Sequence, residues 1–200
     1  MHVRDRAIAA GVSVRSYGEW VANGKTPDDP CTAKVPALEG RIDPLYRSYD
    51  IDYSDIDRAA RFAEELKRFE REGSMPSFIV LRLPNDHTAG TRIGSPTPTA
   101  YVAQNDQGVG LLVDAVSHSS FWKDTAIFVV EDDSQDGADH INAHRIPALV
   151  VSPYARRGGV VHTRYDLMSV VRSIELILGM HALTLNDANA TPMYDAFTPE

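Results

Sequence analysis

The chain has 200 residues, of which 43% are hydrophobic and 24% are charged, as in an ordinary globular protein with a core. A formal net charge of −8 gives an acidic surface that repels phosphate backbones, so nucleic acid is not an expected partner. No apolar run approaches the roughly 18–20 residues of a transmembrane segment, and residues 1–10 are too polar for a secretory signal. The single cysteine, Cys31, excludes an internal disulfide.

The first half of the chain predicts alternating helices and strands around one long loop. Residues 4–10 have helix-forming composition and residues 12–17 form a short strand-like run. Residues 21–50 are rich in proline and glycine, which predicts a long irregular loop, and long ordered loops are more often functional than not. Ser54 is the predicted N-cap of a second helix with an apolar stripe, which Gly73 ends.

The second half continues the alternation. The apolar runs at residues 77–83, 125–130 and 146–151 are predicted strands, and residues 99–117 form a helix between the first two. A last helix covers residues 165–178, with Thr163 as its predicted N-cap. Near-continuous apolar strands are typical of sheets covered on both faces. The predicted fold class is therefore α/β, with three α/β/α layers and a mostly parallel central sheet.

Polar segments follow three of these strands, where ligands bind in open parallel sheets. They are PNDHTAG at residues 84–90, EDDSQDGADH at residues 131–140 and SPYARRGGVVHT at residues 152–163. Because the carboxyl ends of parallel strands meet at one edge, we expect the segments to build one site.

The second segment carries the densest set of potential metal ligands. Glu131, Asp132 and Asp133 leave the strand together, and adjacent carboxylates repel one another unless a cation neutralises them. The alternative interpretation is a solvated acidic loop. Carboxylates and imidazoles bind zinc and manganese-like ions, and the following residues add more of both: Asp136, Asp139, His140 and His144.

Two further candidates are ambiguous. Asp86 and His87 are either ligands or an ordinary turn pair, since an Asx turn also explains Asn85 and Asp86. His162 is either a third imidazole ligand or a loop residue.

No residue is identified as a nucleophile. A hydroxyl nucleophile needs a neighbouring base or metal, and the sequence has neither a G-x-S-x-G elbow nor a phosphate-binding glycine motif. Ser134 and Ser152 lie near the predicted site without such a pattern. Arg156 and Arg157 suit the binding of a phosphate group, although a solvated turn explains at least one of them.

The chain resembles the phosphoesterase family that includes bacterial phospholipases C and related acid phosphatases, within the alkaline phosphatase superfamily. It is similar above all to the branch found as a C-terminal domain after a β-propeller in some bacterial proteins. The matching stretches span nearly the whole chain in family order: GVSVRSYGEW, LRLPNDHTAGT, FWKDTAIFVVEDDSQDGADHINAHRIPALVVSPYARRG, HTRYDLMSVVRSIELILGM and ATPMYDAF.

The resemblance implies a phosphatase or phospholipase C-like hydrolase of small phosphoesters that uses a divalent metal ion, whether zinc, manganese or calcium. Asp132 and Asp133 match the family's pair of metal ligands, and His87 matches a histidine that faces the phosphate or metal. Together with the candidates above, the predicted site assigns metal binding to Asp132, Asp133, Asp86 and His162, catalysis to His87 and His140, and substrate binding to His144 and Arg156.

One departure from the family bears on activity. Family members carry an upstream Glu-Asn ligand pair and a region that supplies a serine or threonine nucleophile, and this chain matches the family after both. We therefore expect residues 1–200 to be the C-terminal part of one phosphoesterase domain, incomplete and inactive alone, with an upstream β-propeller as a further expected partner. The alternative is a truncated or degenerate module that binds a metal or partner without turnover. The cellular location stays open.

Overall fold

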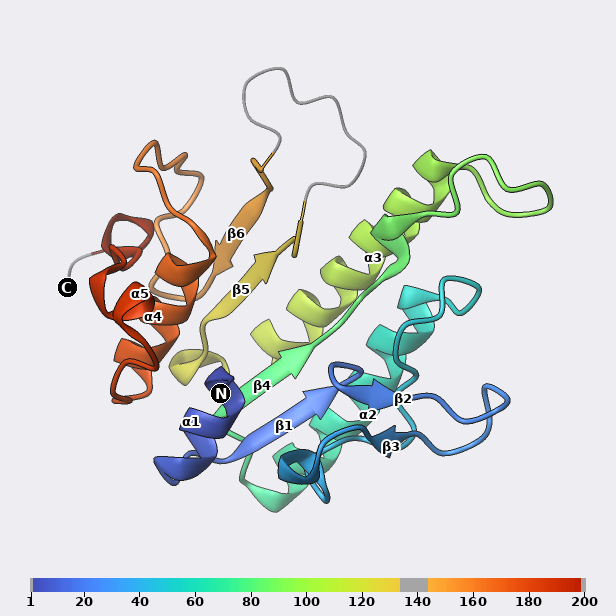
Figure 1. Cartoon of the computed structure of the whole chain (residues 1–200), viewed down its shortest axis with the longest axis horizontal. Coiled ribbons are helices and arrows are strands. Elements are labelled where there is room, and N and C mark those ends of the chain that lie inside the picture. Colours follow the sequence, from blue (N-terminus) through green and yellow to red (C-terminus); the bar gives the residue numbers. More distant parts are fainter. Residues whose placement is uncertain (1, 134–143, 199–200) are drawn as a thin grey trace. The chain divides into compact units, whose positions relative to one another are not determined.

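The computed structural model describes residues 2–133 and 144–198, which form two compact units (Figure 1). One unit is built from residues 7–121, and the other from residues up to Arg6 together with those from Trp122 onward. Helix α1 (Val3–Ala9) begins in one unit and ends in the other. Within the described ranges, no helix is both long and apolar enough to cross a membrane.

The unit of residues 7–121 contains a parallel pair of strands. Strand β1 (Val14–Tyr17) lies beside β4 (Phe78–Leu81), with Val14 opposite Phe78 and Tyr17 opposite Leu81. This pair, with the helices around it, confirms the predicted α/β class. The crossover between them holds the antiparallel strands β2 (Val21–Ala22) and β3 (Thr32–Ala33), the 3-10 turn η1 (Pro36–Leu38) and helix α2 (Asp55–Glu72).

Helix α2 begins and ends where the sequence predicts. The Ser54 hydroxyl accepts a hydrogen bond from the Ile56 amide at 3.1 Å, and Gly73 adopts a left-handed φ of 67° at the C-terminus. The apolar stripe buries Phe62, Leu66 and Phe69. Helix α3 (Pro98–Ser117), capped by Thr97, packs against α2, and the 3-10 turn η2 (Asn85–His87) lies against α3.

The long loop is anchored in the core of this unit. Tyr46 is fully buried and its ring meets Tyr17 edge-on at 5.4 Å, while Tyr17 meets Phe62 at 5.1 Å. The Ser48 hydroxyl donates to the Gly18 carbonyl at 2.5 Å. Gly18 has a φ of 85°, and a side chain there would press on the backbone of Ser48. The end of the loop therefore lies at the carboxyl edge of β1 and β4.

The other unit pairs its two strands in the antiparallel direction. Strand β5 (Ile127–Val130) lies beside β6 (Ala148–Val151), with Val130 opposite Ala148. The remaining elements are the 3-10 turns η3 (Trp122–Asp124) and η4 (Tyr194–Ala196) and two helices that contact each other, α4 (Leu167–Ile177) and α5 (Leu185–Asn189).

Two local expectations need correction in this unit. The apolar runs suggested parallel strands, but β6 runs opposite to β5, and a run of apolar residues does not distinguish the two directions. Helix α4 is capped by Asp166 rather than Thr163, because Asp166 and Ser169 form a reciprocal capping box. Thr163 instead donates its hydroxyl hydrogen to Asp195 at 2.5 Å.

Candidate functional site

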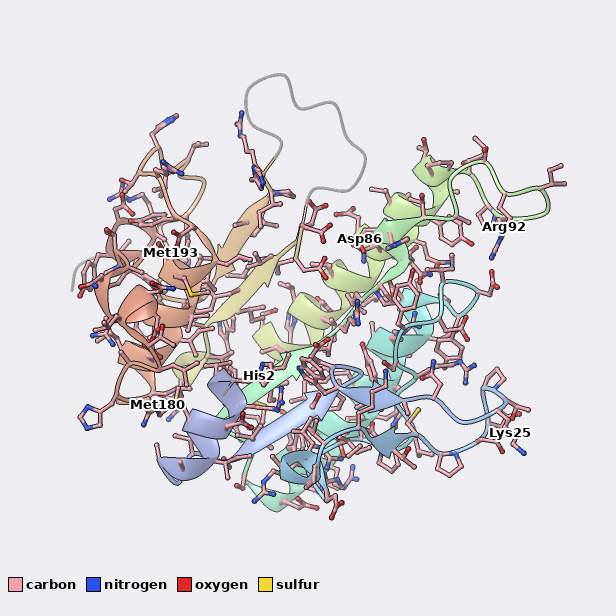
Figure 2. All side chains as sticks on the ribbon, viewed as in Figure 1. His2, Lys25, Asp86, Arg92, Met180 and Met193 are labelled. Atoms are coloured by element: carbon pink, nitrogen blue, oxygen red, sulfur yellow. The ribbon has the colours of Figure 1, made fainter. Side chains whose placement is uncertain are left out.

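The turn after β4 presents Asp86 and His87 at the edge where the sequence predicts a site. Figure 2 shows Asp86 on the segment that runs beside α3. Asp86 is half-buried and His87 is exposed. The His87 Nδ1 atom lies 3.1 Å from the carbonyl oxygen of Thr88. Because a carbonyl oxygen only accepts, this contact is a hydrogen bond when the imidazole carries its proton on Nδ1.

A buried polar cluster holds this turn, and the sequence did not predict it. The Asn85 amide nitrogen donates to Asp55 Oδ2 at 2.9 Å, and the Asn85 side chain donates to Gln104 at 2.6 Å and to the Tyr53 carbonyl at 3.0 Å. The Asn85 side chain therefore bonds to other elements. Asn105 of α3 also donates to Asp55 Oδ2, at 3.0 Å.

Arg58 is the centre of this cluster and is completely buried. Its guanidinium donates to the carboxylate of Asp55 at 2.9 Å and to the side-chain oxygen of Asn85 at 3.3 Å. It also donates to four backbone carbonyls that lead into α2, those of Arg47, Ser48, Asp50 and Tyr53, at 2.7–2.8 Å. All five of its N–H groups are used, so Arg58 ties the long loop to the Asn85 turn.

The loop also supplies an aromatic neighbour for His87. The Tyr49 ring meets the imidazole edge-on at 5.5 Å, and the Arg82 guanidinium lies 5.2 Å from the centre of the same ring. Tyr49 keeps 41% of its surface exposed. A tyrosine in a long irregular loop gives no sequence signal for such a role. Asp55 and Arg58 do give one, because they are charged residues on the buried face of α2.

The second polar segment leaves β5 at Glu131, which is half-buried. Asp132 and Asp133 are exposed, and the Asp133 amide donates to Asp132 Oδ1 at 3.2 Å. Because β6 is antiparallel, His144 approaches β6 at the end of the strand pair where Asp132 leaves β5. Residues 134–143 lie outside the described residues, and with them Ser134, Asp136, Asp139 and the predicted catalytic His140.

The third polar segment starts from the opposite end of the β5–β6 pair. The Ser152 hydroxyl donates to the carbonyl of Thr125, which precedes β5, at 2.9 Å. Arg156 and His162 are exposed. Hydrogen bonds from Thr163 and Tyr165 and the nearby charge of Arg156 lower the pKa of Asp195. The Arg156 guanidinium therefore lies near the Asp195 carboxylate of η4.

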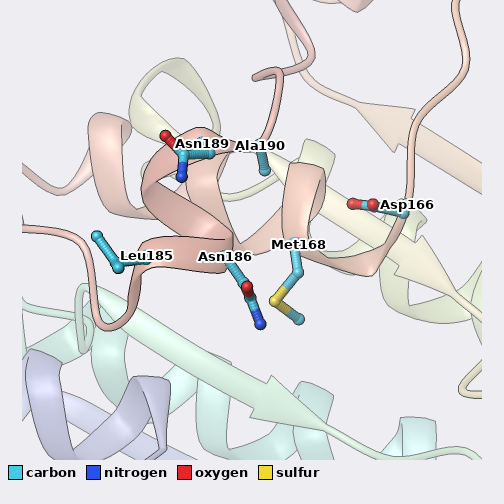
Figure 3. Close-up of a pocket in the computed structure, with 6 residues that line it drawn as sticks. All are labelled: Asp166, Met168, Leu185, Asn186, Asn189 and Ala190. Atoms are coloured by element: carbon cyan, nitrogen blue, oxygen red, sulfur yellow. The ribbon is translucent and has the colours of Figure 1, made fainter.

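No complete metal site is formed by the described residues. Among residues 2–133 and 144–198, no three His, Cys, Asp or Glu side chains gather in a metal-binding group. An open groove of about 440 Å³ lies at the starts of α4 and α5 and includes none of the predicted site residues (Figure 3). Its lining consists of Asp166, Met168, Leu185, Asn186, Asn189 and Ala190.

Comparison with known families gives one match, and it covers all three polar segments. The model of the Phosphoesterase family matches residues 9–181. No curated protein matches the chain. Since the match covers well over half of the sequence, this chain belongs to the Phosphoesterase family.

Proposed function

We propose that this chain takes part in the hydrolysis of small phosphoesters, and that Asp132 and Asp133 form part of a divalent-metal site. The family match carries the proposal, because residues 9–181 include all three polar segments that supply the proposed residues. Two adjacent exposed carboxylates tolerate one another best with a counter-charge, which supports the choice of these two residues.

The proposed roles follow from the chemistry of the side chains. A bound divalent ion would draw charge from the phosphoryl oxygens. His87 would exchange a proton with the leaving oxygen, and Arg156 would contact the phosphate. Asp86 and His162 remain proposed ligands, His140 a proposed acid or base, and His144 a proposed substrate contact.

The test is hydrolysis of an aryl phosphate and an aryl phosphodiester with zinc, manganese or calcium added. The 200-residue chain is assayed beside a fusion that adds the upstream half of a related phosphoesterase. In the fusion we expect turnover that needs metal and that Asp132→Ala lowers by at least about 100-fold, as the loss of a principal electrostatic group does. Asp124→Ala is the matched control, because that carboxylate is exposed and precedes β5.

The outcomes separate two functions. If Asp132→Ala leaves turnover unchanged, Asp132 is not a ligand of the catalytic metal. If neither protein hydrolyses these esters while the chain still binds metal through Asp132, the chain is a binding module without catalysis.

A further inference from the structure

The residue after His87 has a backbone conformation that threonine rarely adopts. Thr88 has φ 58° and ψ 173°, a region that is essentially restricted to glycine. Such a conformation persists only where the surrounding structure imposes it, and it is found most often where function needs it. In Thr88 it sets the orientation of the peptide group whose oxygen bonds to His87 Nδ1.

Local hydrogen bonds hold the strained residue in place. The Thr88 amide donates to the Asn85 carbonyl at 3.0 Å, and the Gly90 amide donates to the Thr88 hydroxyl at 3.1 Å. The position of Thr88 therefore depends on Asn85, whose backbone and side chain are fixed by Asp55, Arg58, Tyr53 and Gln104. The strain at Thr88 is thus supported by a buried cluster that is itself fully bonded.

The contact with the Thr88 carbonyl is a hydrogen bond only if His87 carries its proton on Nδ1. With Nδ1 protonated, the neutral imidazole carries its lone pair on Nε2. A free imidazole side chain in water favours the other tautomer, with the proton on Nε2. The turn thus selects the form in which Nε2 accepts a proton or bonds to an electrophile.

We propose that Thr88 and the buried cluster of Asp55, Arg58, Asn85 and Gln104 are positioning residues that hold His87 as its Nδ1–H tautomer, with Nε2 as the reacting nitrogen. The role of His87 in catalysis rests on the proposed function, but the tautomer does not.

The direct test is long-range ¹H–¹⁵N NMR of the imidazoles in alkaline buffer, where histidine side chains are neutral. His87→Gln assigns the signal by its loss. The wild-type chain should show a protonated Nδ1 and an unprotonated Nε2 at His87. A wild-type His87 with its proton on Nε2 would overturn the proposal, whatever the protein catalyses.

Two substitutions at Thr88 test the backbone. Thr88→Pro cannot adopt a positive φ and removes the amide that bonds to Asn85, so His87 should shift to the Nε2–H tautomer. Thr88→Gly adopts the same φ without strain and should keep the Nδ1–H tautomer. Retention of the Nδ1–H tautomer in Thr88→Pro would count against the mechanism.

The cluster has a matched pair of variants on one helix. Gln104 accepts from Asn85, whereas Gln107 is exposed on α3. Gln104→Ala should introduce a detectable share of the Nε2–H tautomer, and Gln107→Ala should introduce none. If Gln104→Ala leaves the tautomer intact, the cluster does not act on His87.

Kinetics distinguish this inference from the proposed function. In whichever protein of the hydrolysis assay shows turnover, Thr88→Pro should lower kcat by about 10–100-fold with little change in KM. Proton transfer is affected by this substitution and substrate binding is not. An unchanged kcat refutes the positioning role alone. Absence of hydrolysis in every form, with the tautomer switch intact, refutes only the proposed function.

Discussion

Arg58 illustrates how one residue connects loop, helix and site. The side chain is fully buried, and the carboxylate that it bonds is Asp55, which is fully buried as well. Removing one member of a buried ion pair leaves the other charge uncompensated, which is far more costly than removing an exposed pair. The contribution of Arg58 to stability therefore differs sharply from that of the surface cations on the same helix.

We predict that Arg58→Met lowers the free energy of unfolding by about 3–5 kcal/mol. Lys67→Met makes a comparable change on the same helix, but Lys67 and its partner Glu64 are both largely exposed. Its effect should stay within about 0.5 kcal/mol. Urea denaturation of both variants measures the difference. Similar losses in the two would mean that the burial of Arg58 is energetically unimportant.

A second buried group, the carboxyl of Glu175, should make the stability of the protein depend on pH. Burial and a hydrogen bond with Asp187 raise the pKa of Glu175. Burial opposes ionisation of Asp187, but hydrogen bonds from Thr184 and the Leu183 amide outweigh it and lower the pKa of Asp187 to about 2. Asp187 therefore stays ionised across the ordinary pH range, whereas Glu175 keeps its proton to a higher pH than an ordinary glutamate does.

Because the pKa of Glu175 is raised in the folded state, protonation of Glu175 stabilises the fold. This contribution to the free energy of unfolding is fully present below about pH 4.5, the ordinary pKa of a glutamate, and is lost as the pH rises through the raised pKa. Glu175→Gln replaces the carboxyl hydrogen with an amide donor at every pH. The Tm of the variant should therefore rise relative to that of the wild type as the pH increases from about 4.5 to about 7. A constant difference over that range would contradict the assignment.

At the scale of elements, Gly108 of α3 lies directly against Asp55, the first residue of α2. A Cβ at Gly108 would lie 3.0 Å from the Asp55 carbonyl oxygen and 3.1 Å from the Asp55 Cβ atom. A Cβ at Gly110, two residues along α3, would meet no atom within 4 Å. The two glycines look alike in the sequence and differ in what they face.

We predict opposite effects of alanine at these positions. Gly110→Ala should stabilise the protein by up to about 1 kcal/mol, because alanine favours the helix. Gly108→Ala has the same helical gain but forces α3 away from Asp55, so it should destabilise by about 1–2 kcal/mol net. Denaturant midpoints of the two variants test the sign. A stabilising Gly108→Ala would show that the helices separate at no cost.

The helices and the parallel pair of β1 and β4 were largely predictable from the sequence, and the antiparallel pairing of β5 and β6 was not. Ser54 and Gly73 mark the ends of α2 through local chemistry that the sequence contains. The directions of β5 and β6 depend on their partners, and an apolar run is the same in either direction. Asp166 and Thr163 both suit an N-cap, and the reciprocal bond with Ser169 decides between them.

The candidate site was predictable only in part, for the same reason. Asp86 and His87 follow a buried strand, so their place at its edge could be inferred. Arg58 and Asn85 join parts of the chain that are far apart in sequence, and no local pattern records that contact. The hypothesis that His87 and Asp132 share one ligand stays a prediction.

At the scale of the whole molecule, the proposed function can be tested first through metal binding. Asp132 and Asp133 supply two carboxylates at the end of β5, and His144 returns to the same end of the strand pair. Tight zinc sites use about four ligands and calcium sites use six or more. We therefore expect weak binding of zinc or manganese by this chain, with Asp132 as a principal ligand.

Calorimetry of the chain with each ion tests this expectation. Asp132→Ala should abolish the measurable heat of binding, because a carboxylate is lost from an already small ligand set. Asp124→Ala should leave the heat unchanged, since that exposed carboxylate lies before β5 rather than after it. If the wild type and Asp132→Ala bind the ion equally well, Asp132 is not a metal ligand. Asp133→Ala would then show whether the end of β5 binds an ion at all.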